Sequence, residues 1–436
     1  MRDSLVLINP PSPWLIDDRT SMPLGLLYIA SHVEQVVGYP VELVDRSGRS
    51  DTPIPAGRRF YGLTAATPQW PGVRGLIQQI RAATPEATII VGGPHPTALP
   101  QPCLNEGCDV VVIGEGETQM EQLLQGVAPH TIEGAVTRHS PRVIHAPRIE
   151  NLDALPFPAR DRVMGYQKHT IITSRGCPFR CAFCCSETIW GRRVVTRSVQ
   201  NVIAEVDHMI AMQGARFIVF QDETFGLKRG WLEQFCEQIA QRDVEWGIQT
   251  RAQLCTPEFA ARVHDAGCRE VSLGIESGSA AMLRRYGKST PQANLDAIRT
   301  LHRAGLRCRG YFIVGLPGET EFSVDETERF LTQAMSRGLT GAIVGPYVPY
   351  PGCSLSASQQ GPDLRYERYY HYGSKEAGHG SAIGEHAERI RRWNDRLQAT
   401  LGQLNEFVRY EQLRKRLPAV RRRLAASAAI EVVPSI

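Results

Sequence analysis

Short apolar runs alternate with amphipathic stretches along about the first 130 residues of the chain. Runs rich in β-branched residues predict buried strands at 4–8, 41–44, 61–64, 88–91 and 110–113. The stretches 25–37 and 71–83 carry apolar stripes with a period near 3.6 residues, which predicts helices. Buried strands that alternate with helices are typical of a doubly wound parallel sheet.

The connection between the second and third of these strands lacks the pattern of a helix. It spans about fifteen residues after Val44 and contains Pro53, Pro55 and Gly57. Proline and glycine oppose helix formation, although a crossover between parallel strands ordinarily contains a helix. We therefore predict a Rossmann-like domain in which one crossover helix is reduced to a loop.

A second alternation of strands and helices follows a proline-marked linker. Apolar runs predict six strands, at 169–173, 217–221, 245–249, 270–273, 310–314 and 341–344. Helical stretches lie between them, at 199–212, 230–241, 257–264, 291–303 and 323–335. Six strand–helix units in this order fit a partial or full parallel barrel, whose site lies at the carboxyl ends of the strands.

The chain therefore divides into four regions. We expect a Rossmann-like domain at 1–140, a linker at 141–164, a barrel at 165–355 and a helical C-terminal region at 356–436. The last region is rich in arginine, and its run Arg421–Arg423 is most simply a solvated helix end.

Composition and charge narrow the class of protein. Of the 436 residues, 42% are hydrophobic and 22% are charged, which is ordinary for a globular protein. A formal charge of +4 is too small to argue for a nucleic-acid partner. No apolar run approaches the roughly 18 residues of a membrane span, and no leader pattern opens the chain. We expect a cytoplasmic protein with no membrane contact.

The 11 cysteines are unevenly distributed, and their odd number opposes a disulfide framework. Seven are scattered, as small buried residues usually are, and four lie within nine residues: Cys177, Cys181, Cys184 and Cys185. The first three form a C-x₃-C-x₂-C pattern after a predicted strand, and thiolates this close suit one soft metal centre. Electron-carrying [4Fe–4S] clusters and structural zinc sites take four ligands. Cys185 is adjacent to Cys184 and poorly placed to be the fourth.

This pattern resembles the signature of the radical S-adenosylmethionine (radical SAM) superfamily, here written C-P-F-R-C-A-F-C over residues 177–184. The resemblance implies a [4Fe–4S] cluster on Cys177, Cys181 and Cys184, whose open iron binds the methionine moiety of SAM. It also implies reductive cleavage of SAM to a 5′-deoxyadenosyl radical, with Phe183 near the adenine.

Later strands of the predicted barrel resemble the SAM-binding segments of the same superfamily. Besides Phe183, the resemblance assigns to SAM residues near the carboxyl ends of the second to fifth strands: Gln221, Asp222, Arg251, Ser272, Glu276, Ser277, Ile313, Gly315 and Leu316. Glu276 would accept a ribose hydroxyl, and the backbone of 313–316 would lie against the adenine.

The amino-terminal domain resembles the cobalamin-binding domain that precedes the barrel in a large radical SAM subclass. The segments V-G-G-P-H-P-T over 91–97 and C-D-V-V-V-I-G-E-G-E over 108–117 carry this resemblance. If cobalamin binds, its nucleotide tail would be held by the following residues: Thr64, Thr67, Gln69, Gly92, Gly93, Gly114 and Gly116. No D-x-H-x-x-G motif supplies a histidine for cobalt, and His95, which follows the Gly-Gly turn, is interpreted as an ordinary turn residue. The short loop at 45–59 counts against the cofactor. Cobalamin binding is left open.

Two enzymatic functions and one other remain. The main hypothesis is hydrogen abstraction from a small polar substrate, an aminosugar or polyol, with dehydration of a sugar diol, as in the aminoglycoside diol-dehydratases of antibiotic pathways. Its catalytic candidates at the barrel mouth are Asp222, Glu223, Gln249 and Tyr350, with either carboxylate as the base. The alternative is a cobalamin-dependent radical C-methyltransferase. The third is an iron–sulfur scaffold or redox sensor, which the SAM-like segments disfavour.

Electrons for the cluster must come from outside the chain. The cysteines beyond Cys185 are too dispersed to hold a second cluster. We therefore expect an external reductant such as flavodoxin or ferredoxin, with a partner reductase as a further candidate. An oxygen-sensitive cluster also fits the reducing cytoplasm.

Overall fold

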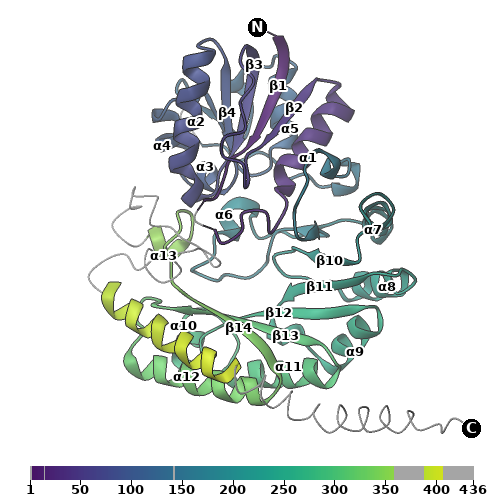
Figure 1. The fold of residues 1–436 in the computed structure, drawn as a ribbon, viewed down its shortest axis with the longest axis vertical. Helices are drawn as coiled ribbons and strands as arrows, with labels where there is room; N and C mark the ends of the chain where they lie inside the picture. The colour runs from purple at the N-terminus through teal and green to yellow at the C-terminus, as the bar shows by residue number, and fades with distance from the viewer. Residues whose placement is uncertain (1, 14, 141–142, 358–386, 406–436) are drawn as a thin grey trace, which may run out of the picture.

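A computed structural model describes residues 2–13, 15–140, 143–357 and 387–405 of the chain. Figure 1 shows two α/β units, one above the other, with the cysteine loop and its short helix between them. The predicted fold class is confirmed, because each unit is built on a six-stranded, mainly parallel sheet and the last described segment is helical. No helix among these residues is long and apolar enough to cross a bilayer.

The amino-terminal sheet has the strand order β2-β1-β3-β4-β5-β6. Its strands are β1 (Arg2–Asn9), β2 (Val41–Asp45), β3 (Arg58–Thr64), β4 (Thr88–Gly92), β5 (Val110–Val112) and β6 (Ala135–Thr137). The first five are parallel and correspond to the five predicted strands, whereas β6 joins the edge antiparallel to β5. The strand order reverses between β1 and β3, because the chain adds β2 on one side of β1 and β3 on the other, and in such sheets ligands bind at the carboxyl ends beside this point.

Helices cover both faces of this sheet. On one face lie α1 (Leu24–His32), which continues as the π-helical η1 (Val33–Val37), and α5 (Glu117–Leu124). On the other lie α2 (Trp70–Ala83), α3 (Pro94–Ala98) and α4 (Pro100–Asn105). The predicted loop is confirmed, since no helix forms between Asp45 and Arg58.

The second sheet is fully parallel, in the order β14-β13-β12-β11-β10-β7, so it is a partial barrel. Its strands are β7 (His169–Ile171), β10 (Phe217–Phe220), β11 (Glu245–Thr250), β12 (Cys268–Glu276), β13 (Arg307–Val314) and β14 (Leu339–Pro346). Its outer helices are α7 (Val199–Gln213), α8 (Arg229–Ile239), α9 (Pro257–Asp265), α11 (Pro291–Arg303) and α12 (Glu321–Ser336). All six strands and five helices were predicted, because each pairs an apolar run with a buried face.

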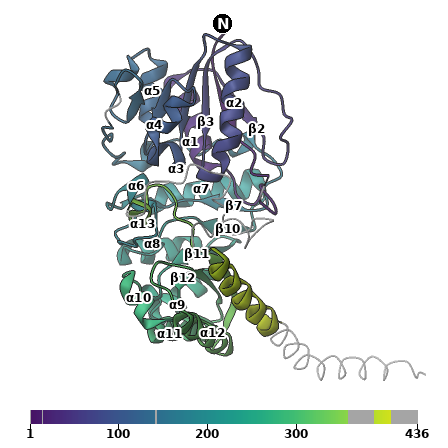
Figure 2. The same cartoon turned by 90° about the vertical axis from the view of Figure 1, so that its left-hand side faces the viewer.

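A helix at 387–405 packs beside β14 and α12 (Figure 1), and Figure 2 shows it along one side of the barrel unit. Its residues Trp393, Leu397 and Leu401 are buried in the barrel core, and Gln398 Nε2 donates to the Val344 carbonyl at 2.6 Å. It thereby covers part of an edge strand that would otherwise present open backbone groups. The rest of the predicted helical region, including Arg421–Arg423, lies outside the described residues.

Candidate active site

The cysteine loop is closed by a short antiparallel pair, β8 (Ser174–Arg175) with β9 (Val195–Thr196). Between these strands lie the three predicted ligands and α6 (Ser186–Trp190). Gly176 opens the loop at φ +106°, and a Cβ there would lie 2.3 Å from the Arg193 carbonyl oxygen. Only glycine allows this approach, so the sequence Gly176-Cys177 is a requirement of the loop's closure.

Each of the three thiols has its own polar neighbour. Cys177 Sγ lies 3.6 Å from Thr224 Oγ1, Cys181 Sγ accepts from Arg251 Nη1 at 3.6 Å, and Cys184 Sγ accepts from the Ser186 amide at 3.4 Å. Within the described residues no three Cys, His, Asp or Glu side chains are grouped tightly enough for a single metal ion. A four-iron cluster binds each thiolate on a separate iron, and three thiols on one loop can supply such ligands.

Cys185 is turned to other partners. Its Sγ lies 3.5 Å from the Pro351 carbonyl oxygen and against the thiol of Cys353, on the loop after β14. Cys185 thus contacts residues outside the cysteine loop, and Cys177, Cys181 and Cys184 remain the predicted cluster ligands.

The residues predicted to hold adenine come together. Phe183 and Ile313 pack against one buried cluster that contains Leu316 and Tyr286. The Phe183 and Tyr286 rings meet edge to face with centroids 6.1 Å apart, and Tyr286 Oη donates to the Pro317 carbonyl at 2.6 Å. Gly315 donates its amide to the buried Glu319 carboxylate. Burial raises the pKa of Glu319 to about 7, although the amides it accepts from oppose that rise.

The site residues predicted on β12 and directly after it have different partners in the structure. Glu276 is the one non-glycine residue with positive φ (71°) in the described chain, and its Oε1 lies 3.0 Å from Lys288 Nζ. Such strained backbone clusters at functional sites. Ser272 aligns with Gln249 of β11, and both lie on the face opposite the core residues Ile248, Val271 and Leu273. Ser277 instead bonds Thr327 Oγ1 at 3.1 Å, so it supports α12.

Asp222 and Gln221 have hydrogen-bond partners in the structure that do not match the roles predicted for them. The Asp222 carboxylate accepts from the Thr173 amide at 2.6 Å, from the Thr173 hydroxyl and from Ser174 Oγ at 2.8 Å. Asp222 therefore holds the segment that leads to the cysteines, and burial raises its pKa. Gln221 is exposed and bonds Ser21 Oγ at 3.2 Å. This placement does not support either residue as a SAM contact, nor Asp222 as a base.

Glu223, Arg251 and Tyr350 occupy three different environments. Glu223 lines an interdomain cavity, accepts from Trp190 Nε1 at 2.9 Å, and has its pKa raised by burial. Arg251 lies over the Phe179 ring at 3.8 Å and reaches the Cys181 sulfur. Tyr350 packs against the core of the amino-terminal domain. Of these three, Glu223 and Arg251 are at the site, whereas Tyr350 contributes to the domain contact.

A buried ionic network that the sequence analysis missed joins the domains. Arg175 Nη1 lies 2.9 Å from Glu115 Oε1, and its Nη2 lies 2.7 Å from Glu117 Oε1. All three side chains are at most 5% exposed. Arg148 adds a contact to Glu115 at 2.9 Å. Because Arg175 is two residues before Cys177, this network ties the cysteine loop to the end of β5.

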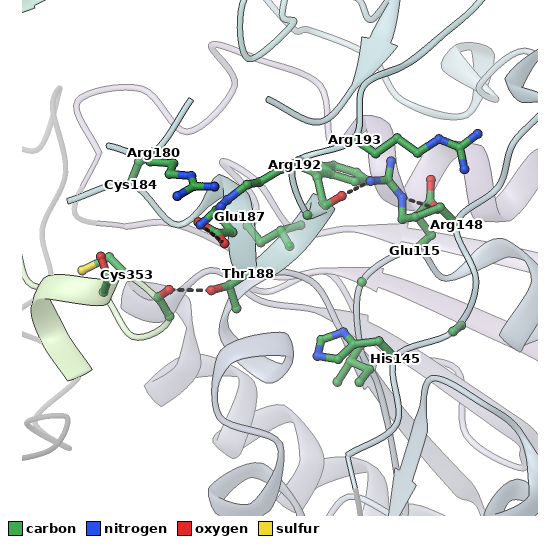
Figure 3. A pocket seen from close by; sticks show the side chains of 18 of the residues that line it. Glu115, His145, Arg148, Arg180, Cys184, Glu187, Thr188, Arg192, Arg193 and Cys353 are labelled. Atoms are coloured by element: carbon green, nitrogen blue, oxygen red, sulfur yellow. Dashed lines mark hydrogen bonds and ion pairs between the residues drawn. The ribbon is translucent and has the colours of Figure 1, made fainter. Parts of the chain in front are cut away.

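Two adjoining cavities lie between the domains. The smaller, about 430 Å³, borders the carboxyl ends of β3, β4 and β5. The larger, about 740 Å³, borders Cys181 and Cys184, and Figure 3 shows Cys184 on its wall. Both are lined by Gly114, Glu115, Ile189 and Trp190. The amino-terminal sheet and the cysteine loop therefore face a shared space.

The residues that line the smaller cavity suit the nucleotide tail of cobalamin. Five of the seven residues predicted to cradle that tail line it: Thr64, Gly92, Gly93, Gly114 and Gly116. The other two are engaged elsewhere, since Thr67 lies 3.3 Å from His95 Nδ1 and Gln69 accepts from the Ala66 amide at 2.8 Å.

His95 and the loop at 45–59 both lie away from the two interdomain cavities. His95 is buried against the Trp70 ring, with centroids 4.9 Å apart, and lines neither cavity. No residue of the loop at 45–59 lines a cavity either. This loop connects the edge strand β2 to β3, so its shortness removes no bulk from the lining of either cavity and does not count against cobalamin.

Comparisons with known proteins agree with this architecture. The model of the radical SAM superfamily matches residues 171–331, and the model of the B12 binding domain matches residues 19–124. An uncharacterized methyltransferase of Pyrococcus horikoshii is 30% identical over 388 residues, which are 80% of this chain and 82% of the relative. The anaerobic magnesium-protoporphyrin IX monomethyl ester cyclase of Rubrivivax gelatinosus is 29% identical, over 62% of this chain and 53% of the relative.

A solved structure shows the same arrangement of domains. It is the radical SAM methyltransferase TsrM of Kitasatospora setae with cobalamin and a [4Fe–4S] cluster bound. Its TM-score is 0.67, with 82% of this chain and 78% of that chain covered at 19% identity, which shows a shared fold.

A three-cysteine loop at the mouth of a parallel partial barrel, facing a glycine-rich doubly wound domain, defines a radical SAM enzyme with a cobalamin-type domain. The chain belongs to this family, the radical SAM superfamily with an amino-terminal B12-binding domain. Its cofactors are accordingly a [4Fe–4S] cluster and SAM.

The comparisons also correct the predicted activity. Dehydration of a sugar diol is contradicted, because relatives of this chain are named as methyltransferases. The softer resemblance to aminoglycoside diol-dehydratases has no support among them. The prediction failed because its evidence, acidic and amide groups at the barrel mouth, does not distinguish hydroxide loss from other hydrogen-abstraction chemistry.

Proposed function

We propose that this protein is a cobalamin-dependent radical SAM methyltransferase. The observation that carries the proposal is the shared interdomain space, into which the glycine-rich ends of β4 and β5 and the cysteine loop both face. A methyl group carried on the amino-terminal domain would there be next to the barrel's reaction centre. The methyltransferases among the relatives support the same function.

When bound, a [4Fe–4S] cluster with SAM would supply radical chemistry, and cobalamin would supply a methyl carrier. Cys177, Cys181 and Cys184 would hold the cluster, and the Arg251 guanidinium donates toward the Cys181 sulfur. Phe183 and Leu316 offer an apolar surface for the adenine. Trp190 orients the Glu223 carboxyl at the smaller cavity, and burial raises the pKa of that carboxyl.

The proposed enzyme depends on partners outside the chain. Members of this family need a reductant and act on small substrates. We propose flavodoxin or ferredoxin as the reductant and the reducing cytoplasm as the compartment, because an open cluster with thiolate ligands is easily oxidised.

Cobalt retention tests the proposal. The protein is reconstituted anaerobically with iron, sulfide and hydroxocobalamin, desalted, and analysed for metals and for its ultraviolet–visible spectrum. We expect about four irons and one cobalt per chain. Thr64→Trp, which fills the smaller cavity, should lose cobalt and keep iron, whereas Asp51→Trp, on the loop that lines neither cavity, should keep both. Wild-type protein that retains iron without cobalt would refute the proposal.

A further inference from the structure

The wall of the larger cavity carries an excess of positive charge. Its described lining includes four arginines, Arg148, Arg180, Arg192 and Arg193, against two glutamates, Glu115 and Glu187. A concave site lined mainly by one sign of charge concentrates the electrostatic field and attracts ions of the opposite sign.

The carboxylates near the cavity do not neutralise all of these arginines. Glu115 is shared by Arg148 and the buried Arg175. Glu150 pairs with Arg193 at 2.5 Å. Glu187 pairs with Arg192 at 2.7 Å. Arg180 has no ion pair or hydrogen bond within the described part of the chain, so one guanidinium has no carboxylate partner there.

Arg192 is also available to a ligand at small cost. In its pair with Glu187 the two side chains are 40% and 51% exposed, and exposed pairs of this kind contribute little to stability. Figure 3 shows Arg180 beside the Arg192–Glu187 pair, on the part of the wall that also carries Cys184. Two guanidinium groups thus lie on one side of the cavity, on the part of its wall that carries Cys184.

We propose that the larger cavity is the substrate site and that Arg180 and Arg192 bind an oxyanionic group of the substrate, a phosphate, phosphonate or carboxylate. Guanidinium groups match the geometry of these anions with paired hydrogen bonds. Ile189 and Trp190 supply an apolar wall for the remainder of the molecule. The inference rests on the proposed function, which places the methyl acceptor beside the cluster.

Binding of simple probes tests this site without knowledge of the substrate. Isothermal titration calorimetry on the reconstituted full-length protein compares phenyl phosphate, benzoate and the uncharged benzyl alcohol. We expect an anionic probe to bind at least about tenfold more tightly than the alcohol, because charge-assisted hydrogen bonds to arginine are the strong ones. Phenyl phosphate ahead of benzoate assigns a phosphorus oxyanion, and the reverse order assigns a carboxylate.

Variants separate the site from general charge. Arg192→Gln and Arg180→Gln should each weaken the preferred anion at least about threefold, and the double variant at least about tenfold. Arg216→Gln removes an exposed arginine that pairs with Asp243 on the barrel and should leave binding unchanged. Arg192 follows the segment 177–184 that carries the three ligand cysteines, whereas Arg180 lies within it. Anion binding by Arg192→Gln therefore tests the site even if Arg180→Gln loses iron. Unchanged anion binding in Arg192→Gln or in the double variant, or equal binding of benzyl alcohol, overturns the inference.

The outcome is independent of the test of function. Protein without cobalt that still discriminates anions through Arg180 and Arg192 would refute methyl transfer and leave an anion site. Protein with cobalt that shows no anion preference would keep the proposed function and refute this site.

Discussion

Removal of Arg175 should destabilise the protein strongly, because its two carboxylate partners are buried. Glu117 is buried, and Arg175 is its one ion-pair partner among the described residues. Burial by itself raises the pKa of Glu117, but the Arg175 charge and hydrogen bond outweigh that effect and hold the pKa below its usual value. Breaking a buried pair by removing one partner typically costs about 3–5 kcal/mol. Glu115 keeps Arg148, so the lower part of that range is expected.

The assay is urea unfolding followed by tryptophan fluorescence, at pH 7 and at pH 5. In the wild type the depressed pKa of Glu117 gives stability that is present above its unfolded value and is lost as the pH falls through the folded value. In Arg175→Met the buried carboxyl has a raised pKa instead, and acid relieves its cost. The loss of about 3 kcal/mol at pH 7 should therefore shrink toward pH 5.

A matched control is Arg216→Gln, since Arg216 and its partner Asp243 are 74% and 95% exposed and should contribute less than about 1 kcal/mol. An Arg175→Met loss below about 1 kcal/mol at pH 7, or a loss that grows as the pH falls, would refute the reasoning.

Three further predictions concern the cluster loop and the SAM site. Cys184→Ala should lose most of the bound iron while Cys185→Ala keeps it, because Cys185 faces Pro351 and Cys353; iron analysis of reconstituted protein decides, and equal loss in both would contradict the three-ligand assignment. Gly176→Ala should also lose iron, since its Cβ would lie 2.3 Å from the Arg193 carbonyl oxygen, and normal iron content there would show that the loop closes differently. Glu276→Ala should weaken SAM binding, measured by equilibrium dialysis, with iron content unchanged; binding equal to the wild type would remove Glu276 from the site.

The apolar pattern was sufficient to predict most of the framework. Every barrel strand joins a buried apolar face to a helix with a clear period, and both signals are local. The antiparallel β6 was missed because it has three residues, and α6 because its five residues lie between the cysteines and Gly191. Neither length allows a period to be recognised.

Within the site, residues that are close in the sequence could be predicted, whereas contacts between distant residues could not. The cysteine loop could be predicted, because its ligands lie within eight consecutive residues. Arg175 and Glu117 are 58 positions apart, and only the packing of the two domains brings them together. Asp222 shows the opposite error: an acidic residue at a strand end suggested catalysis, but Thr173 and Ser174 occupy its carboxylate.

The most direct test of the account follows a deuterated methyl group from SAM. Reconstituted protein with reduced cobalamin is incubated with S-(methyl-d₃)-SAM, and the cobalamin fraction is analysed by mass spectrometry. We predict that the label is recovered with cobalamin in the wild type and lost in Thr64→Trp, with Asp51→Trp behaving as the wild type. Cleavage of SAM to 5′-deoxyadenosine with no label on cobalamin would contradict methyl transfer and leave a radical SAM enzyme of another activity.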